Sequence, residues 1–286
     1  MKVAAVVVTH NRPKLLAEVL DALRSQTRRL DSIIVVDNAS GAETSALLSG
    51  SEDIDVVRLE KNVGGAGGFS AGVQRAVSSG FDWVLLLDDD AVPRRDCLTQ
   101  LLEQVGHTGT RVGAICTTVI EFGETALMHR RRFNTATLAE PVLPAAAYEL
   151  PVTEIDTGSF VGFMLQSSAA REVGAPDASF FLAYDDTEYS LRLKRAGWSI
   201  WLAPGAVVDH KRPAGGRLRS GPYGLKHYYN LRNQLAVFRV YGEAPSWRMW
   251  VPLVKHGAVA IKDRRWASVK LFWKAWRDSW DVMRGR

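Results

Sequence analysis

The chain has 286 residues, of which 47% are hydrophobic, and it carries a formal net charge of +5. A chain of this length and composition can bury the core of a large α/β domain with an appendage, which excludes a disordered protein. Cys97 and Cys116 form neither a CxxC nor a Cys/His zinc spacing, so neither a disulfide scaffold nor a structural zinc site is suggested and a reducing compartment is indicated.

The first 120 residues alternate strand and helix signals, as is typical of a mostly parallel sheet. Apolar runs predict strands at 3–10, 32–38, 55–60 and 83–88. Helix signals lie at 11–27, after Ser40, at 69–79 and at 96–105. The first apolar run is short, which favours a strand over a signal peptide, and no run reaches the about 18 apolar residues that a membrane-spanning helix needs. We therefore expect a soluble or peripheral protein.

Polar residues follow each of the four predicted strands. They are Thr9 and His10, then Asp37 and Asn38, then Asn62, and then Asp88, Asp89 and Asp90. Because ligands bind outside the carboxyl ends of the strands in an open parallel sheet, we expect these side chains to line one cleft. A hard divalent cation such as Mg²⁺ or Mn²⁺ would let the adjacent carboxylates ionise together, and it would imply an anionic partner. A solvated acidic turn is the alternative.

The glycine-rich run at 62–68 does not complete a nucleotide-binding motif. Ser70 breaks GxGxxG at its last position, and GxxxxGK[ST] is absent, so neither a dinucleotide site nor a P-loop is expected. Gly64, Gly65, Gly67 and Gly68 instead allow the backbone to approach a ligand closely or to turn sharply into the next helix.

Residues 245–286 differ from the rest of the chain in charge and in tryptophan content. They contain ten Lys or Arg and three Asp, a net charge of +7, which leaves −2 for the other 244 residues. They also contain six of the nine tryptophans: Trp247, Trp250, Trp266, Trp273, Trp276 and Trp280. Basic side chains with interleaved tryptophans favour binding to an anionic membrane surface. The alternatives are helices whose tryptophans pack on the main domain, and nucleic-acid binding, which we do not expect.

Several motifs taken together resemble the inverting glycosyltransferases of family 2. They are VVVTHNRPKLL, IIVVDNAS, KNVGGAGGFSAG, WVLLLDDDAVP and FFLAYDDTEYSLRLKRAGW, and they cover about residues 3–210. The resemblance implies an α/β nucleotide-diphospho-sugar transferase fold of the GT-A type, with a Rossmann-like, mostly parallel sheet flanked by helices. We expect a catalytic domain at 1–215 and a helical, membrane-associating region at 216–286. NVGGAGGF with the triple Asp is most similar to bacterial galactofuranosyltransferases, and rhamnosyltransferases share the scaffold.

The resemblance also implies a donor site and a metal site. The donor nucleotide sugar would be bound by Thr9, Asp37, Asn62, Gly65, Asp88 and Asp89. Within this set, Thr9 and Asp37 would lie against the nucleoside, with Asp37 on the uracil edge. Asp88 and Asp90 match the ends of a DxD motif, and with His210 they would hold the metal ion. An imidazole beside carboxylates favours Mn²⁺ over Mg²⁺. His129 shows no spacing that demands a metal.

Asp186 matches the family's catalytic base. Direct displacement at the anomeric carbon places the base opposite the departing UDP, so it must come from a segment other than the DxD loop, as Asp186 does. We expect the neighbouring Asp185 and Glu188 to raise the pKa of Asp186 by like-charge repulsion. A carboxylate in the first turn of a helix is the alternative. On the acceptor side we expect Asp185, Trp198, Gly158 and Ser159, with core packing as the alternative for Trp198.

Two further segments are open to interpretation. Residues 121–151 follow no family motif and could form a variable acceptor loop, in which Arg130, Arg131 and Arg132 meet an acceptor pyrophosphate or solvent. A YYxxRN pattern, formed by Tyr228, Tyr229, Arg232 and Asn233, would border donor or acceptor phosphates or have a structural role.

The sequence thus predicts a metal-dependent inverting glycosyltransferase, peripheral at the cytoplasmic face of the plasma membrane. It would move galactofuranose from a UDP-sugar to a lipid-linked saccharide in cell-wall or polysaccharide biosynthesis. A rhamnosyltransferase that uses dTDP-rhamnose and a catalytically silent sugar-nucleotide-binding protein are the alternatives.

Overall fold

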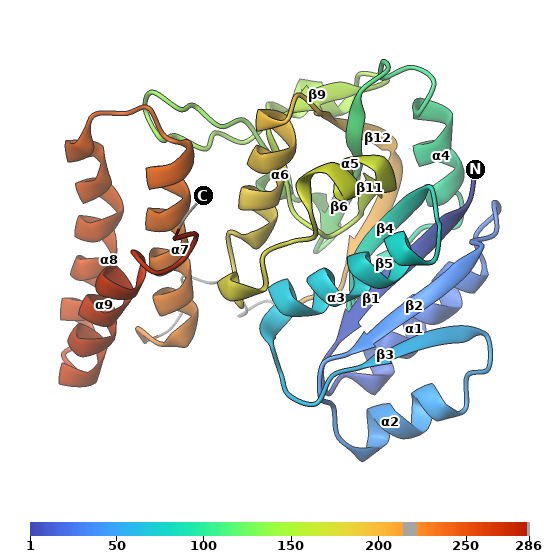
Figure 1. Cartoon of the computed structure of the whole chain (residues 1–286), viewed down its shortest axis with the longest axis horizontal. Helices are drawn as coiled ribbons and strands as arrows, with labels where there is room; N and C mark the ends of the chain where they lie inside the picture. Colours follow the sequence, from blue (N-terminus) through green and yellow to red (C-terminus); the bar gives the residue numbers. More distant parts are fainter. Residues whose placement is uncertain (214–221, 285–286) are drawn as a thin grey trace.

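The computed structural model describes residues 1–213 and 222–284 and is built around a ten-stranded mixed sheet (Figure 1). The strand order is β3-β2-β1-β4-β11-β6-β12-β5, with β7 added to β6 and β9 added to β12. Its strands are β1 (Val3–Thr9), β2 (Ser32–Asp37), β3 (Ile54–Arg58), β4 (Trp83–Asp88), β5 (Ala91–Pro93), β6 (Val112–Glu121), β7 (Glu124–Thr125), β9 (Thr153–Ile155), β11 (Phe163–Gln166) and β12 (Ser199–His210). A small second sheet pairs β8 (Arg130–Arg131) with β10 (Thr157–Gly158).

The expected α/β architecture is confirmed. Strands β3, β2, β1 and β4 are parallel, and β6 is parallel to β12, whereas β11 and β5 run antiparallel to their neighbours. The helices of the main domain are α1 (Pro13–Arg24), α2 (Ala42–Ser49), α3 (Gly64–Ser78), α4 (Cys97–Gln104), α5 (Ser167–Val173) and α6 (Asp185–Arg195).

Helices cover both faces of the sheet, which explains why its strands are continuously apolar. Along β1, Val3, Ala5 and Val7 face α1 and α4, whereas the alternate residues Ala4, Val6 and Val8 face α3. The two hydrophobic layers together form the core that fixes the strand ends in place.

Helix α3 begins five residues before the start that the sequence predicts, because the glycine-rich run is helical. A Cβ atom on Gly68 would lie 2.5 Å from Cγ1 of Val8, so the glycine lets α3 pack directly on β1. Gly64, at φ +74°, makes the sharp turn before it, and a Cβ there would meet the carbonyl oxygen of Phe181 at 2.0 Å. Packing has overridden the low helix propensity of glycine.

The C-terminal region consists of α7 (Leu225–Tyr241), α8 (Trp250–Lys262) and α9 (Trp266–Asp278). Helix α7 lies between the main domain and the α8–α9 pair (Figure 1). Its Tyr228, Leu231 and Leu235 pack with Phe272 of α9, while its Phe238 packs toward Phe180 of the main domain. The predicted domain boundary at residue 215 lies outside the described residues. None of the helices in the described ranges has the length and apolar character to cross a membrane.

Candidate active site

The ends of β1, β2 and β4 bring the predicted nucleotide-binding residues together. Thr9 is in register with Asp37 on β2, and Val8 is in register with Asp88 on β4. The Thr9 hydroxyl donates a hydrogen bond of 2.8 Å to Asp89 Oδ2. The parallel strand order therefore brings these polar strand ends together, as the strand endings predicted.

Asp37 is buried and has one acceptor oxygen to spare. Its Oδ1 accepts a 2.9 Å hydrogen bond from the backbone N–H of Ser40. Its Oδ2 lies 3.3 Å from Nε of Arg58 but accepts no hydrogen bond of good geometry. A buried carboxylate oxygen that accepts no hydrogen bond is suited to a donor such as the imide N–H of uracil.

Asn62 and Gly65 lie at the turn into α3. Asn62 is exposed, and its Oδ1 accepts hydrogen bonds from the Gly64 N–H at 2.8 Å and from Asn38 Nδ2 at 3.2 Å. Asn62 therefore shapes the turn. The space next to Gly65 is open, so a ligand could approach its backbone. Asn38, which also donates to the Gly64 carbonyl at 3.0 Å, is a supporting residue.

Two of the three aspartates, Asp89 and Asp90, are held by one arginine and one histidine. Arg12 Nη1 lies 3.1 Å from Asp89 Oδ1 and 2.8 Å from Asp90 Oδ2, and His210 Nε2 lies 3.2 Å from Asp90 Oδ1. Burial, and then the charge of Asp90, raise the pKa of Asp88 to about 7. Burial also acts to raise the pKa of Asp90, but His210 and Arg12 outweigh it and the pKa is lowered.

The residues at this site fit a divalent cation. Asp88, Asp90 and His210 each offer a ligand atom, and these atoms lie within 4.8 Å of one another. Two carboxylates and an imidazole suit Mn²⁺ better than Mg²⁺, which prefers oxygen ligands. The charge of a cation would also offset the repulsion between Asp88 and Asp90.

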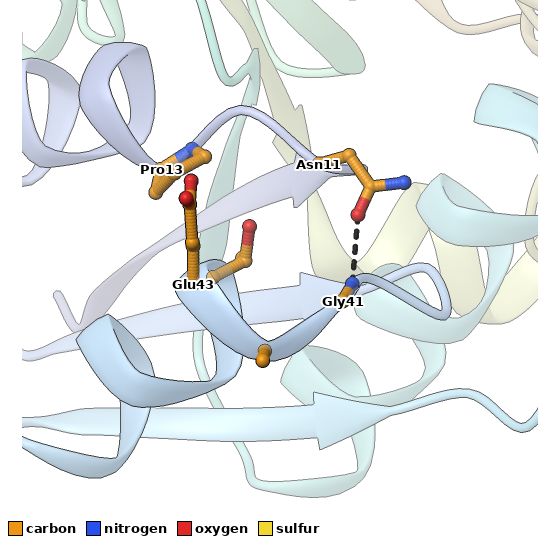
Figure 2. Close-up of a pocket in the computed structure, with 6 residues that line it drawn as sticks. Asn11, Pro13, Gly41 and Glu43 are labelled. Carbon is orange, nitrogen blue, oxygen red and sulfur yellow. Dashed lines mark hydrogen bonds between the residues drawn. The ribbon is translucent and has the colours of Figure 1, made fainter.

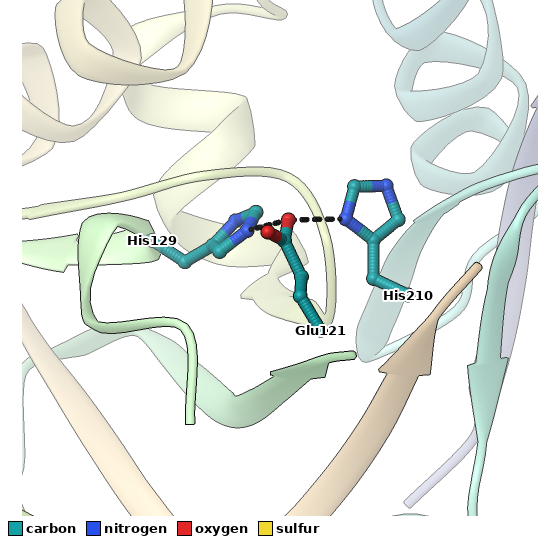
Figure 3. A group of neighbouring side chains, drawn as sticks. All are labelled: Glu121, His129 and His210. Carbon is teal, nitrogen blue, oxygen red and sulfur yellow. Dashed lines mark hydrogen bonds and ion pairs between the residues drawn. The ribbon is translucent and has the colours of Figure 1, made fainter. Parts of the chain in front are cut away.

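A second group of side chains, which the sequence does not reveal, lies behind His210 (Figure 3). Glu121 Oε1 is 3.0 Å from His210 Nδ1 and 3.0 Å from His129 Nε2. Burial lowers the pKa of His129 to about 4. The three residues come from separate segments, so no sequence spacing could have indicated the group.

The predicted base lies at the start of α6. Tyr184, at φ +63°, turns the chain so that Asp185 and Asp186 begin the helix. Asp186 Oδ1 accepts a 2.6 Å hydrogen bond from the Thr187 N–H. Burial raises the pKa of both carboxyl groups, and the charges of Asp186 and Asp88 raise that of Asp185 further.

Glu188, which we expect to raise the pKa of Asp186, has an ion-pair partner in α6 and a hydrogen-bond partner in α7. Glu188 forms a bidentate ion pair with Arg192, at 3.1 and 2.7 Å, and accepts a 2.9 Å hydrogen bond from the Tyr241 hydroxyl. Its charge is therefore compensated within α6 and α7. Burial is the leading cause of the raised pKa of Asp186, and the charge of Arg131 opposes it.

The predicted acceptor residues are placed differently from one another. Ser159 Oγ lies 2.7 Å from His129 Nδ1, beside the Glu121 group. Gly158 is buried in β10, where a Cβ would lie 2.8 Å from Cys116 Sγ. Trp198 is only 9% exposed and lies beneath the guanidinium of Arg111, at 4.4 Å, so its indole has little surface for a sugar ring and the packing alternative is favoured.

Two arginine-containing motifs have structural partners. Arg130 is fully buried and donates to the backbone carbonyls of Thr117 and Val161 at 2.9 and 2.7 Å, so it meets neither solvent nor an acceptor pyrophosphate. In the YYxxRN pattern, Arg232 donates to the Phe180 carbonyl at 2.9 Å. Asn233 donates to the carbonyls of Phe180, Leu182 and Ala183 at 2.9, 2.9 and 2.7 Å. These contacts support the loop that precedes Asp185.

A separate depression lies beside the loops that follow β1 and β2 (Figure 2). Asn11 and Pro13 line one side of it, and Gly41 and Glu43 at the start of α2 line the other. Asn11 Oδ1 accepts a 2.7 Å hydrogen bond from the Gly41 N–H, which ties the two loops together. Asp88, Asp89 and Asp90 do not line this depression, so it is distinct from the site that these three carboxylates form.

The sequence model of glycosyl transferase family 2 matches residues 4–172 of the chain. Galactofuranosyltransferase GlfT1 of Mycolicibacterium smegmatis is 30% identical over 257 residues, which are 81% of this chain and 81% of that protein. GlfT1 of Mycobacterium tuberculosis is 35% identical over 73% of this chain and 69% of its own length. The O-antigen chain rhamnosyltransferase RfbN of Salmonella typhimurium is 24% identical over 73% of this chain and 66% of its own length.

Solved structures share the fold at low sequence identity. A crystal structure of GalNAc-T7 with UDP, GalNAc and Mn²⁺ matches with a TM-score of 0.65 at 15% identity, over 99% of this chain and 56% of that chain. The S. aureus TarS fragment 1–349 in complex with UDP matches with a TM-score of 0.62 at 13% identity, over 99% of this chain and 81% of that chain.

Proposed function

Because the chain belongs to glycosyl transferase family 2 and is a glycosyltransferase, we propose that it moves galactofuranose from UDP-galactofuranose to a lipid-linked saccharide by an inverting, metal-dependent displacement. One observation carries the mechanism: two acidic groups from distant segments of the chain lie close enough for their charges to interact. The charge of Asp88, at the end of β4, raises the pKa of Asp185, at the start of α6, and Asp186 follows directly. The group at Asp88 is suited to a metal ion that binds the diphosphate, and the group at Asp186 is suited to the acceptor hydroxyl.

Asp88, Asp90 and His210 would hold the metal ion. When bound, the ion supplies a Lewis acid that stabilises the negative charge of the leaving UDP. Thr9 orients Asp89 at the floor of the site, and Arg12 provides a further positive charge beside Asp89 and Asp90. Asp37 would accept a hydrogen bond from the imide N–H of the base, a group that uracil and thymine share.

Asp186 would act as the general base. Its carboxylate takes the proton of the acceptor hydroxyl while the hydroxyl oxygen forms a bond to the anomeric carbon and the bond from that carbon to UDP breaks. Attack from the face opposite UDP inverts the configuration at this carbon. The raised pKa of Asp186, caused mainly by burial, brings it closer to the working pH of a base.

The relatives favour galactofuranose as the donor sugar. Two of the more similar relatives are named galactofuranosyltransferases and match over most of their own length. A rhamnosyltransferase that uses dTDP-rhamnose is the second candidate, because RfbN matches over a similar part of the chain at lower identity. A silent sugar-nucleotide-binding protein is disfavoured because the chain retains Asp186 together with both ends of the DxD motif.

Membrane association at the inner face of the plasma membrane is proposed for α8, α9 and the turn before them. An exposed apolar stripe runs along α8 through Val251, Val254 and Ile261, which is 70% exposed. The tryptophans of this region add to it: Trp247, Trp250, Trp266, Trp273, Trp276 and Trp280 are all exposed. With a net charge of +7 at residues 245–286, this face suits an anionic lipid surface, where a lipid-linked acceptor would be found.

A donor panel tests the proposal. Purified protein receives UDP-galactofuranose, UDP-galactopyranose, UDP-glucose, UDP-N-acetylglucosamine or dTDP-rhamnose with a lipid-linked saccharide extract, and with Mn²⁺ or EDTA, and nucleotide release is measured. We expect Mn²⁺-dependent release from UDP-galactofuranose. Release from dTDP-rhamnose alone would assign the second candidate. UDP binding without release from any donor would support the silent binding protein.

A further inference from the structure

We propose that Glu121 is a positioning residue that holds His210 through Nδ1, so that Nε2 faces Asp90 and is the nitrogen that would bind a metal ion at Asp88 and Asp90. This inference rests on the metal site of the proposed function. It assigns a role to Glu121, His129 and Arg212, three residues outside the predicted motifs.

The sheet itself places the three central residues in a row. β12 lies between β6 and β5, and Asp209 of β12 is in register with Ile120 of β6. The next residues along these two parallel strands are His210 and Glu121. On the other side, His210 is in register with Ala91 of β5, so Asp90 lies next to it. His210 is therefore flanked by Glu121 on one side and Asp90 on the other.

The contact with Glu121 places a proton on Nδ1 of His210. An ionised carboxylate only accepts hydrogen bonds, so the 3.0 Å contact between Glu121 Oε1 and His210 Nδ1 requires a proton on Nδ1 (Figure 3). Nε2 faces Asp90 at 3.2 Å, where it donates to that carboxylate when no metal is bound, and a metal ion at Asp88 and Asp90 would replace the proton on Nε2 while the proton on Nδ1 stays. A carboxylate behind a histidine fixes both the tautomer and the ring orientation of a metal ligand in this way.

Glu121 is itself held on both oxygens. His129 Nε2 lies 3.0 Å from Oε1, and Arg212 Nε lies 2.7 Å from Oε2. By the same reasoning His129 Nε2 is protonated, and its Nδ1 accepts the hydrogen bond of 2.7 Å from the Ser159 hydroxyl. The side chains of Glu121 and His210 are only 12% and 11% exposed, so water competes little for these contacts.

These contacts also argue against a second metal site at Glu121, His129 and His210, although their ligand atoms lie close enough for one. The guanidinium of Arg212 already occupies Oε2 of Glu121 and would repel a cation there. A cation bound to His210 Nδ1 would also displace the proton that the Glu121 contact requires. The arrangement supports one metal at Nε2 of His210.

The test measures Mn²⁺ affinity directly, by electron paramagnetic resonance of the free ion, with UDP present. Glu121→Gln is compared with Glu124→Gln, the same change at an exposed residue three positions further along. We expect Glu121→Gln to weaken Mn²⁺ binding about 10- to 100-fold, and to raise the Mn²⁺ concentration for half-maximal activity with a smaller effect on kcat at saturating metal. Glu124→Gln should match the wild type. Equal Mn²⁺ affinity in all three proteins would overturn the proposal.

A second measurement does not depend on the stability of Glu121→Gln. Nitrogen-15 NMR of the histidine rings in the wild-type protein with Mg²⁺, assigned with His210→Gln, should show the proton of His210 on Nδ1. An Nδ1 without a proton would overturn the inference even if Glu121→Gln is unstable. The proposed function fails in a different way, since a wild-type protein that binds neither Mn²⁺ nor UDP would have no metal site for Glu121 to support.

Discussion

Arg12 forms an ion pair with Asp90, with Nη1 2.8 Å from Oδ2, at one of the carboxylates proposed as a metal ligand. The arginine side chain is 46% exposed, whereas that of Asp90 is only 5% exposed. Arg12, which is free to move into solvent, therefore neutralises the charge of Asp90, which is buried and fixed. Arg12 and a metal ion would share Asp90, and the diphosphate of the donor would attract the arginine in turn.

Replacing Arg12 should accordingly have two opposite effects. In Arg12→Gln, we expect Mn²⁺ to bind several-fold more tightly in the absence of nucleotide, because a competing charge is gone. The KM for the UDP-sugar should rise about tenfold, because a charge-assisted hydrogen bond to the diphosphate is lost. Calorimetry with Mn²⁺ and steady-state kinetics measure the two effects, and Arg24→Gln on the outer face of α1 is the control. Unchanged Mn²⁺ affinity would show that Arg12 does not compete for Asp90.

Asp186→Asn should remove catalysis while the fold remains intact. We expect transfer to fall by about 10²- to 10⁴-fold, the usual contribution of a general base, with UDP affinity unchanged. A carboxyl group whose pKa is raised in the fold stabilises it when protonated and loses this contribution as the pH rises. Because Asn resembles the protonated form, the Tm of the variant at pH 8 should equal or exceed that of the wild type. The exposed Asp21→Asn is the control, and near-normal turnover in Asp186→Asn would refute the assignment.

The pH dependence of transfer should report the environment of Asp186. Burial raises its pKa and Arg131 opposes this shift, so the acidic limb of the kcat profile should lie above the usual range of an Asp, near 3.9. Activity is present above that pKa and is lost as the pH falls through it. Arg131→Gln removes the opposing charge and should move the limb to higher pH. If the acidic limb lies at the same pH in the wild type and in Arg131→Gln, a group other than Asp186 controls it.

The membrane proposal is best tested by surface substitutions, because α8 and α9 pack on α7 and a deletion would expose that interface. A triple variant, Trp250→Ser, Val254→Ser and Ile261→Ser, should reduce co-sedimentation with vesicles that contain phosphatidylglycerol by about tenfold. Leu150→Ser, at an exposed apolar residue of the main domain, should have no effect. Wild-type binding should also weaken with added salt. Undiminished binding of the triple variant would contradict the assigned surface.

The parallel half of the sheet could be predicted from sequence to within two residues at each strand end. Buried runs such as Val3–Thr9 and Trp83–Asp88 carry their own signal, because both faces are covered and polar residues stop them. The clustering of Thr9, Asp37 and Asp88 could also be predicted, because the carboxyl ends of neighbouring parallel strands lie at the same edge of the sheet. The start of α3 could not be predicted, since it depends on how closely Gly68 approaches Val8.

The rest of the site depends on contacts between segments that are far apart in the chain. Glu121 and His129 meet His210 only because β6 and β12 pair, and nothing near residue 121 indicates this. Arg130 looks like part of a solvated basic run, yet it is buried by carbonyl oxygens that only the folded chain supplies. Charge patterns in the sequence identify ionic residues but do not identify their partners.

The three hydrogen bonds from Asn233 to the loop before Asp185 connect the C-terminal helices to the chemistry. One side of α7 carries α9, and the other side carries the segment that presents Asp186. For an enzyme resting on a bilayer, this arrangement would fix the height of the base above the lipid headgroups. The reach of the acceptor's saccharide from its lipid anchor would then decide which hydroxyl arrives at Asp186. In this way the position of α7 would select acceptors by the length of their saccharide.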